Sequence, residues 1–443
     1  MDRAKPVLID DVAINRFHQF LTARTGGGWI MVGYILSIIG VATLSMSEKL
    51  GLSGLWQGMV AAMALLGVFC GGFLGGWLTD KLGRQKLFYA SPAVIFLCSI
   101  AMYWVNGGMS LSLLRLVSGL AVGIEYTAAG SLLTEFIPQK SRGSRLSLLT
   151  VLWFLGAALA YIVGNALLND ANGDAWRNVM ASPAVIAGLL FFFRLGTPES
   201  PRWLLSKGRR QEAEKIIKQV YGANFSLKNI AEDKSSGKAM TLSDALRAGY
   251  GKRIFFVVMF WACAVIPVFA VYAFVPKLFQ ALHLTGNLAA WGSMGITLIL
   301  VLGCIAATWL INYIGRRTLI IHSFLWSGLA LLALGLLPDA AGWIVLSLFG
   351  VYALFIGGAQ VLEFVYPNEL FPTEIRASAV GMGASLAALS SAVGTWLVPI
   401  SLQSFGIGVT MLAAAVITLL GLLISLVLAP ETKSMSLQEA AQL

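Results

Sequence analysis

The chain has 443 residues, of which 58% are hydrophobic and 12% charged, and its net charge is +10. Soluble domains carry about 25% charged residues, so this composition excludes an ordinary soluble protein. Twelve apolar runs, each long enough to cross a bilayer as a helix, predict an all-α polytopic membrane protein with twelve transmembrane helices. In chain order they cover about 27–47, 56–79, 87–106, 111–134, 146–168, 178–196, 253–276, 288–311, 318–337, 342–366, 377–400 and 406–429.

The distribution of Lys and Arg predicts the orientation of these helices. With the N-terminus in the cytoplasm, 27 of the 31 basic residues fall on the cytoplasmic side, as the positive-inside rule requires. The net charge is therefore explained by topology, and nucleic-acid binding is not expected. No short apolar core with a cleavage site follows the first 24 residues, so the first run is expected to remain as a helix. Both termini are predicted in the cytoplasm, and the short loops favour a bacterial inner membrane.

Three motif pairs indicate that the chain consists of two similar halves. DKLGRQK at 80–86 matches NYIGRRT at 312–318, EFIPQKSRG from Glu135 matches ELFPTEIRA from Glu369, and PES at 198–200 matches PET at 430–432. The three offsets differ by at most two residues, which favours duplication over chance. We predict two pseudo-symmetric six-helix bundles, at 1–196 and 253–443. A cytoplasmic linker at 197–252 joins them and is expected to contain short helices at 203–221 and 241–253.

Parallel repeats of this kind are a transporter architecture, with the substrate site near the midplane between the halves. Nothing in the chain resembles the filter loop or charged ring of a channel. No catalytic constellation is apparent, so an enzyme is not expected. The four cysteines and three histidines lack metal-ligand spacing, and no metal or cofactor is predicted.

The loop after the second run has a specific composition. Glycines at 71, 72, 75 and 76 predict close packing of that helix on a neighbour. Asp80 is expected to end the helix at the membrane surface, Gly83 to allow the turn, and Arg84 to present a donor fork to a carboxylate.

This loop, GWLTDKLGRQK at 76–86, resembles the signature between helices 2 and 3 of the major facilitator superfamily. The second copy, with Asn312 in place of Asp80, fits the same family. PESPRW at 198–203, the Glu-Pro-Arg-Gly pattern from Glu135 and PETK at 430–433 resemble its sugar-porter branch and related metabolite:proton symporters. The resemblance implies ion-pair networks on the inward side that hold the halves together and break as the protein opens inward. On this sequence the N-half network would use Asp80, Gly83, Arg84, Glu135, Arg142, Glu199 and Arg202, and the C-half network Asn312, Gly315, Arg316, Arg317, Glu369, Arg376 and Glu431.

The run at 111–134 contains Glu125 near its middle. Ionisable residues inside membrane spans are rare and mark functional sites. Arg115 lies ten residues away, about 15 Å along the helix axis, and is not an obvious ion partner. We therefore expect Glu125 to be unpaired and to bind a proton near neutral pH, which makes it the predicted proton-coupling group. The alternative is a structural hydrogen bond to a neighbouring helix.

Other polar and aromatic residues inside the runs are candidates for contact with the substrate. Gln360 and Glu363 share one face of the run at 342–366, although Glu363 could equally be a gate element or an interfacial carboxylate. The remaining candidates, which could alternatively be packing residues, are Tyr34, Tyr126, Trp153, Trp261 and Tyr272.

One departure from the family concerns proton coupling. Proton-coupled relatives often carry an acidic residue in helix 1 before a Gly-Tyr pair, where this chain has Val32. GIEYTAAG also resembles the Gly-Asp-Tyr-Pro motif of phosphate:proton symporters, but the run at 253–276 lacks the acidic and tyrosine residues expected of a phosphate site.

The leading prediction is proton-coupled symport of a small polar organic metabolite, an organic acid or a sugar, by a monomer in the lipid bilayer. Proton-driven efflux, a phosphate-type symporter and a metabolite sensor that transports nothing are the alternatives.

Overall fold

The computed structural model describes residues 8–168, 174–230, 247, 249–284, 286–371, 373–433 and 435. Eleven of the helices in these ranges are long and apolar enough to cross a membrane, judged by length and composition. The last one, α15 (Thr373–Leu428), has a non-helical backbone at Gly406, with φ of 78°. Two predicted runs, 377–400 and 406–429, meet at this break, so α15 contains two crossings, and the described ranges together contain the predicted twelve.

The first half contains the helices before the linker. They are α1 (Arg16–Leu50), α2 (Gly54–Leu82), α3 (Arg84–Ala101), α4 (Gly108–Phe136), α5 (Gln139–Leu168), and α6 (Ala175–Ala181) with α7 (Pro183–Arg194), which together form one crossing. Short 3-10 turns stand at η1 (Ile9–Asp11) and η2 (Met102–Trp104).

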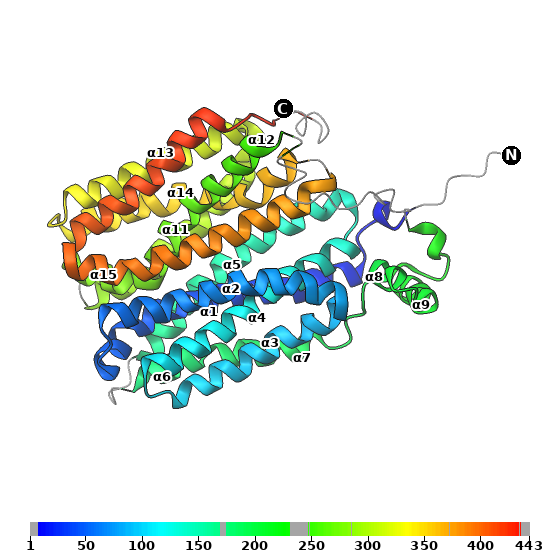
Figure 1. Cartoon of the computed structure of the whole chain (residues 1–443), viewed down its shortest axis with the longest axis horizontal. Helices are drawn as coiled ribbons and strands as arrows, with labels where there is room; N and C mark the ends of the chain where they lie inside the picture. The colour runs from blue at the N-terminus through cyan, green and yellow to red at the C-terminus, as the bar shows by residue number, and fades with distance from the viewer. Residues whose placement is uncertain are drawn as a thin grey trace.

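The second half contains α11 (Gly251–Ala281), α12 (Gly286–Ile314), α13 (Arg316–Leu336), α14 (Gly342–Leu370) and α15. Figure 1 shows the two halves side by side, with the blue-to-cyan helices of the first half below the green-to-red helices of the second. The halves meet where α1, α2 and α5 pack against α11, α12 and α15. The predicted all-α architecture of two bundles is therefore confirmed.

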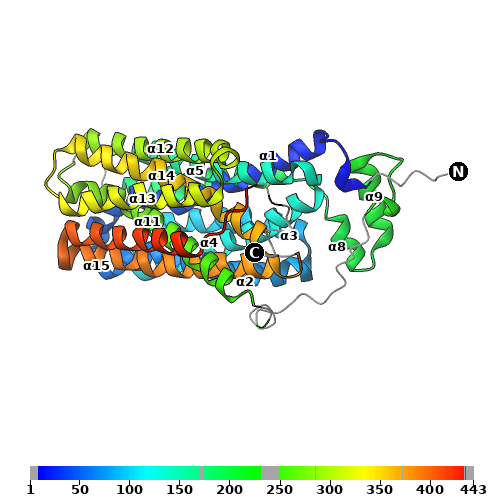
Figure 2. The same cartoon turned by 90° about the horizontal axis from the view of Figure 1, so that it is seen from above.

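The linker between the halves begins with two short helices, α8 (Pro201–Ser206) and α9 (Arg210–Tyr221), followed by η3 (Leu227–Asn229). Figures 1 and 2 both place α8 and α9 beyond one end of the bundle, here called the α8–α9 end. The helix predicted at 203–221 is thus two helices, because Gly208 takes a φ of 74° between them. Most of the segment predicted as a helix at 241–253 lies outside the described residues.

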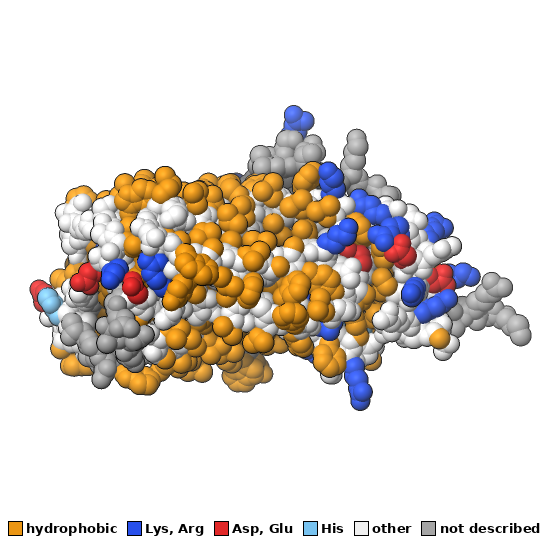
Figure 3. All heavy atoms as spheres, turned by 90° about the horizontal axis from the view of Figure 1, so that it is seen from below, with side chains coloured by type: hydrophobic (Ala, Val, Ile, Leu, Met, Phe, Trp, Pro, Cys, Tyr) orange, Lys and Arg blue, Asp and Glu red, His pale blue; other side chains and the backbone are white. Residues whose placement is uncertain are grey.

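The surface has the amphipathic distribution of a membrane protein. Figure 3 shows hydrophobic side chains over the middle of the molecule, whereas Lys and Arg gather at the α8–α9 end. Large apolar side chains such as Phe192, Trp309 and Trp343 are more than 65% exposed, which is costly in water but favourable against lipid. The chain is an integral, multi-pass membrane protein.

In the first half, α2 packs closely against α4 at two glycine positions. A Cβ built on Gly71 would meet the carbonyl of Leu120 at 2.3 Å, and one on Gly75 would meet the Thr127 hydroxyl at 2.3 Å. These two glycines let α2 approach α4, as predicted. Gly72 and Gly76 have no such close neighbour, so for them the prediction is wrong.

The turns at Gly83 and Gly315 are two copies of one structure. Their φ angles are 99° and 88°, in a region of backbone conformation that is essentially restricted to glycine. A Cβ on Gly83 would lie 2.2 Å from Glu199 Oε2, and one on Gly315 would lie 2.4 Å from Glu431 Oε2. Each turn therefore needs glycine both for its conformation and for the carboxylate packed against it.

We expect Gly83→Ala and Gly315→Ala each to destabilise the protein by about 1–3 kcal/mol, the cost of a residue held in such a conformation, with a further loss where the carboxylate is displaced. Thermal unfolding of the purified variants in detergent checks this. The matched control is Gly76→Ala, where an added Cβ has nothing within 4 Å and the helix should gain slightly in stability.

Candidate functional site

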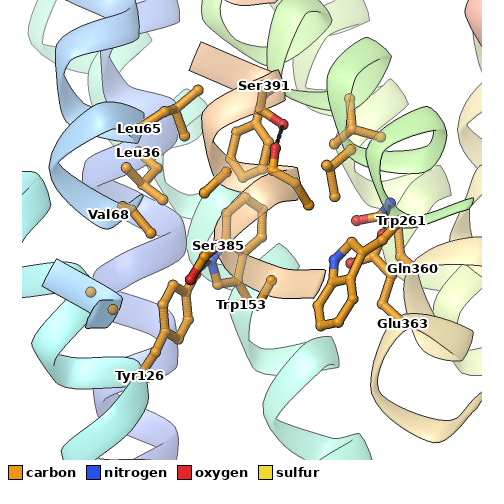
Figure 4. Close-up of a pocket in the computed structure, with 18 of the residues that line it drawn as sticks. Leu36, Leu65, Val68, Tyr126, Trp153, Trp261, Gln360, Glu363, Ser385 and Ser391 are labelled. Atoms are coloured by element: carbon orange, nitrogen blue, oxygen red, sulfur yellow. Dashed lines mark hydrogen bonds between the residues drawn. The ribbon is translucent and has the colours of Figure 1, made fainter. Parts of the chain in front are cut away.

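A cavity of about 260 Å³ lies between the two halves. Its wall is built from α1, α2, α4 and α5 on one side and from α11, α14 and α15 on the other. Figure 4 shows Leu36, Leu65, Val68, Tyr126 and Trp153 facing Trp261, Gln360 and Glu363 across it. The volume is just below the usual range of small-molecule sites, which suits a compact ligand.

Five of the seven residues predicted to contact substrate line this cavity: Tyr126, Trp153, Trp261, Gln360 and Glu363. The other two are absent from its wall. The Tyr34 hydroxyl is 2.7 Å from Ser182 Oγ within the first half, and the buried Tyr272 instead supplies a backbone carbonyl that accepts a hydrogen bond from the Tyr161 hydroxyl at 2.6 Å. Both are packing residues in this structure, so the prediction that they line the site is wrong.

The polar groups of the cavity form two clusters on opposite walls. On the first, Trp153 Nε1 donates to the Tyr126 hydroxyl at 2.8 Å, which leaves the phenolic hydrogen free to donate to a ligand. On the second, Gln360 Nε2 donates to Glu363 Oε1 at 2.7 Å, and the Trp261 side chain is also hydrogen-bonded to Glu363. Hydroxyl groups of Thr127, Thr150, Ser385 and Ser391 complete the polar lining.

Glu125 is not unpaired, and that expectation is wrong. Arg194, at the end of α7, donates from Nη1 to Glu125 Oε2 at 2.8 Å and from Nη2 to Oε1. Both side chains are fully buried, and Glu125 does not line the cavity. The role of Glu125 in proton coupling stays a prediction. The reason for that prediction, a carboxyl without an ion partner, does not hold in the structure.

The surroundings of Arg194 explain how this pair is accommodated. Its Nη1 also donates to the Phe88 carbonyl at 2.7 Å, and its guanidinium lies 3.8 Å from the centre of the Phe88 ring. Arg194 Nε and Nη2 also donate to the Arg24 carbonyl. Gly28 provides the space, since a Cβ there would lie 2.1 Å from Glu125 Oε1 and 2.2 Å from Arg194 Nη2. The pair thus ties α4 and α7 to α1 and α3.

The predicted N-half network divides into two clusters at the α8–α9 end. In the first, Arg84 pairs with Asp80 and Glu135, at 3.2 Å in each case. Glu199 accepts from the backbone N–H groups of Arg84, Gln85 and Ser200 at 2.8–3.2 Å. Burial raises the pKa of the Glu199 carboxyl, although these N–H groups and the Arg84 charge act in the opposite direction.

The second cluster centres on Asp10, which sequence reasoning missed. Asp10 Oδ1 lies 3.2 Å from Arg142 Nη2, and Asp10 Oδ2 lies 2.5 Å from Arg202 Nη2. Arg142 and Arg202 therefore pair with the N-terminal segment and not with the cluster around Arg84. The available signal was weak: an acidic pair at 10–11 within an otherwise basic N-terminal segment.

The C-half network repeats the first cluster. Arg316 pairs with Glu369 at 2.8 Å, and Glu431 accepts from the backbone N–H groups of Arg316 and Arg317 at 3.0 and 3.1 Å. The Arg317 side chain donates to the Leu426 carbonyl at 3.0 Å. The side chains of Asn312 and Arg376 lie outside the described part of the chain.

Within the described residues, the ion pairs of both networks stay inside one half. The hydrogen bonds that join the halves lie towards the opposite end: Thr43 Oγ1 to the Ala273 carbonyl at 3.5 Å, the Tyr161 hydroxyl to the Tyr272 carbonyl, and Lys277 Nζ to Gln57 Oε1. In this structure the networks therefore connect helices within each half. That they also hold the halves together in another state stays a prediction.

Known transport proteins match this chain over nearly its whole length. The model of the family described as "Sugar (and other) transporter" matches residues 21–443. The chain is 39% identical over 435 residues to the putative metabolite transport protein YaaU of Escherichia coli K12, covering 98% of this chain and 97% of that one. It is 26% identical to the arabinose-proton symporter of Bacillus subtilis, covering 98% and 97%.

The fold resembles a partially occluded inward-open structure of the xylose transporter XylE from E. coli. The TM-score is 0.81 at 20% identity, covering 95% of this chain and 100% of that one. The predicted fold, two six-helix bundles of the major facilitator type, agrees with this neighbour. The relatives are transporters and not enzymes. The chain belongs to the sugar (and other) transporter family.

Proposed function

We propose that this protein is a proton-coupled symporter of a small, polar, uncharged metabolite of the sugar or polyol class. The observation that carries the proposal is the cavity between the halves, whose described wall combines hydroxyl, amide and indole groups with one carboxyl group. Aromatic rings can pack against the apolar C–H face of a polyhydroxy ring, while the hydroxyl, amide and indole N–H groups can hydrogen-bond its hydroxyl groups.

The charges of the cavity separate the two substrate classes that the sequence left open. Among the described residues that line it, Glu363 is the ionisable group capable of a charge at neutral pH, and no Lys or Arg is present. An organic acid would place an anion beside this carboxyl without a cation to compensate it. A neutral sugar or polyol avoids this cost, and the arabinose-proton symporter among the relatives supports the same choice.

Alternating access follows from the way the halves meet. Their hydrogen bonds lie towards the end opposite α8 and α9, so a rocking motion that breaks those bonds would open the cavity to that side. The excess of Lys and Arg at the α8–α9 end supports a cytoplasmic location for that end and for the chain termini. A bacterial inner membrane is the membrane we assign, and one chain suffices to build the cavity.

Uptake into proteoliposomes tests this function. D-xylose, L-arabinose and myo-inositol, each radiolabelled, are compared with succinate in the presence and absence of an inwardly directed proton gradient. We expect at least one of the neutral compounds to accumulate with the gradient and to equilibrate only when a protonophore collapses it. Accumulation of succinate instead would contradict the substrate class, and accumulation that ignores the protonophore would contradict proton coupling.

A further inference from the structure

Among the described residues, the buried carboxyl of Glu363 has no cationic side chain as a partner, in contrast to Glu125, which is paired with Arg194. The Glu363 side chain is 4% exposed and lines the cavity wall. Its described hydrogen-bond partners are the Gln360 amide, at 2.7 Å, and the Trp261 side chain. Both partners are neutral, so neither balances a negative charge on Glu363.

The buried cations of the first half are engaged elsewhere. The guanidinium of Arg194 is bound to Glu125 by two hydrogen bonds. Arg115 donates from Nη1 to the Ile35 carbonyl at 2.8 Å, and neither arginine lines the cavity. Glu135 and Glu369, nearer the α8–α9 end, each pair with an arginine.

The titratable groups facing Glu363 from neighbouring helices are also uncharged. Tyr126 on α4 lines the same cavity as Glu363, and Cys304 on α12 contacts α14 through the Gly357 carbonyl. A phenol and a thiol carry no charge at neutral pH in water. From α11 the group is the indole of Trp261. No neighbour among the described side chains therefore supplies a positive charge from α4, α11 or α12. On α13, which also packs against α14, Arg316 is paired with Glu369, Arg317 donates to the Leu426 carbonyl and His322 accepts from Trp326.

A buried carboxylate without a counter-ion is costly, and a bound proton removes that cost. We propose that Glu363 carries the transported proton, in the wall of the substrate cavity, while Glu125 remains ion-paired to Arg194. This inference rests on the proposed proton-coupled function and assigns the residue that performs it.

The step is a simple protonation. When the cavity opens to one side, a proton from water binds a carboxylate oxygen of Glu363, and the resulting O–H can donate to a substrate oxygen. When the cavity opens to the other side, the substrate leaves and the proton returns to water. Because the protonated carboxyl donates a hydrogen bond to the substrate, proton binding favours substrate binding and substrate binding favours proton binding, which is the reciprocity that coupling requires.

Infrared spectroscopy of the purified protein tests the protonation without any substrate. The spectrum of wild type minus Glu363→Gln at neutral pH should contain the C=O stretch of a protonated carboxyl group. The matched control is wild type minus the double variant Glu125→Leu/Arg194→Met, which should contain carboxylate stretches. If the Glu363→Gln difference contains only carboxylate stretches, the proposal is overturned. Glu363→Asp supplies a second variant, in which the protonated band should shift in frequency and not disappear.

A transport measurement tests the coupling itself. In proteoliposomes with labelled L-arabinose, D-xylose or myo-inositol, the ratio of uptake with a proton gradient to uptake without it should fall to one in Glu363→Gln. Glu363→Asp and the Glu125→Leu/Arg194→Met variant should retain a ratio above one. A ratio of one in the double variant, with gradient dependence kept in Glu363→Gln, would return the coupling role to Glu125. If wild type transports none of the three neutral compounds, the proposed substrate class fails, while the infrared result still decides where the proton resides.

Discussion

Glu125→Gln should lower the free energy of unfolding by about 3–5 kcal/mol, the usual cost of breaking a buried ion pair by removing one partner. The reason is that Arg194 would remain fully buried with its charge uncompensated. Its bonds to the carbonyls of Phe88 and Arg24 would persist, which places the expected loss towards the lower end of that range. Chemical or thermal unfolding of the purified variant in detergent measures it.

Replacing both partners distinguishes the lost charge balance from lost packing. Glu125→Leu/Arg194→Met keeps apolar volume at both positions, and such replacements of buried pairs are often neutral or stabilising. We expect the double variant to recover most of the stability that Glu125→Gln loses. Glu135→Gln is the control for a partly buried acid, because the side chains of Glu135 and Arg84 remain 18% and 14% exposed, and it should cost less stability than Glu125→Gln, whose pair is fully buried. A double variant as unstable as Glu125→Gln would contradict this account.

Cross-linking the halves at the end opposite α8 and α9 should abolish transport. Gln57 on α2 and Lys277 on α11 are in contact across the halves. With both replaced by cysteine and joined by a thiol-reactive cross-linker that has a short spacer, the cavity could no longer open to that side. Uptake should fall to the level of empty liposomes and recover when a cleavable linker is cut.

The control cross-link uses the same end of the molecule within one half. Lys49 Nζ lies 3.9 Å from Asp174 Oδ1, and both residues belong to the first half. A link between cysteines at these positions does not join the two halves, so it should leave uptake unchanged. The native cysteines require single-variant controls, since Cys70 is partly accessible. Continued transport with the Gln57–Lys277 positions fully cross-linked would show that the halves do not separate there.

Much of the fold could be predicted from the sequence because it depends on local patterns. Apolar runs of sufficient length define the crossings, and the repeated Gly-Arg turns identify the duplication. Gly83 and Gly315 have nearly the same backbone conformation, and each packs against a glutamate, Glu199 and Glu431, so the repeat in the sequence is also a repeat in the structure. The number of crossings was correct even where α15 continues through Gly406.

The partners of the buried charges could not be predicted, because they depend on how distant helices pack. Glu125 and Arg194 are separated by 69 residues, and Arg194 lies close to the end of the run predicted at 178–196. Asp10 reaches Arg142 and Arg202 across 132 and 192 residues. Helical periodicity assigns a residue to a face of its helix, but it does not identify the helix that packs against that face. Of the predicted aromatic candidates, Tyr126 and Trp153 line the cavity, whereas Tyr34 and Tyr272 have partners elsewhere.

The measurement that tests the central claim most directly is proton movement driven by substrate alone. Proteoliposomes hold a pH-sensitive dye inside and have equal pH on both sides, and the neutral compound that accumulates in the uptake assay is added outside. Proton-coupled symport predicts that the interior becomes more acidic, and that heat-inactivated protein gives no such change. Uptake of the labelled compound at the same rate with no change of internal pH would contradict the account.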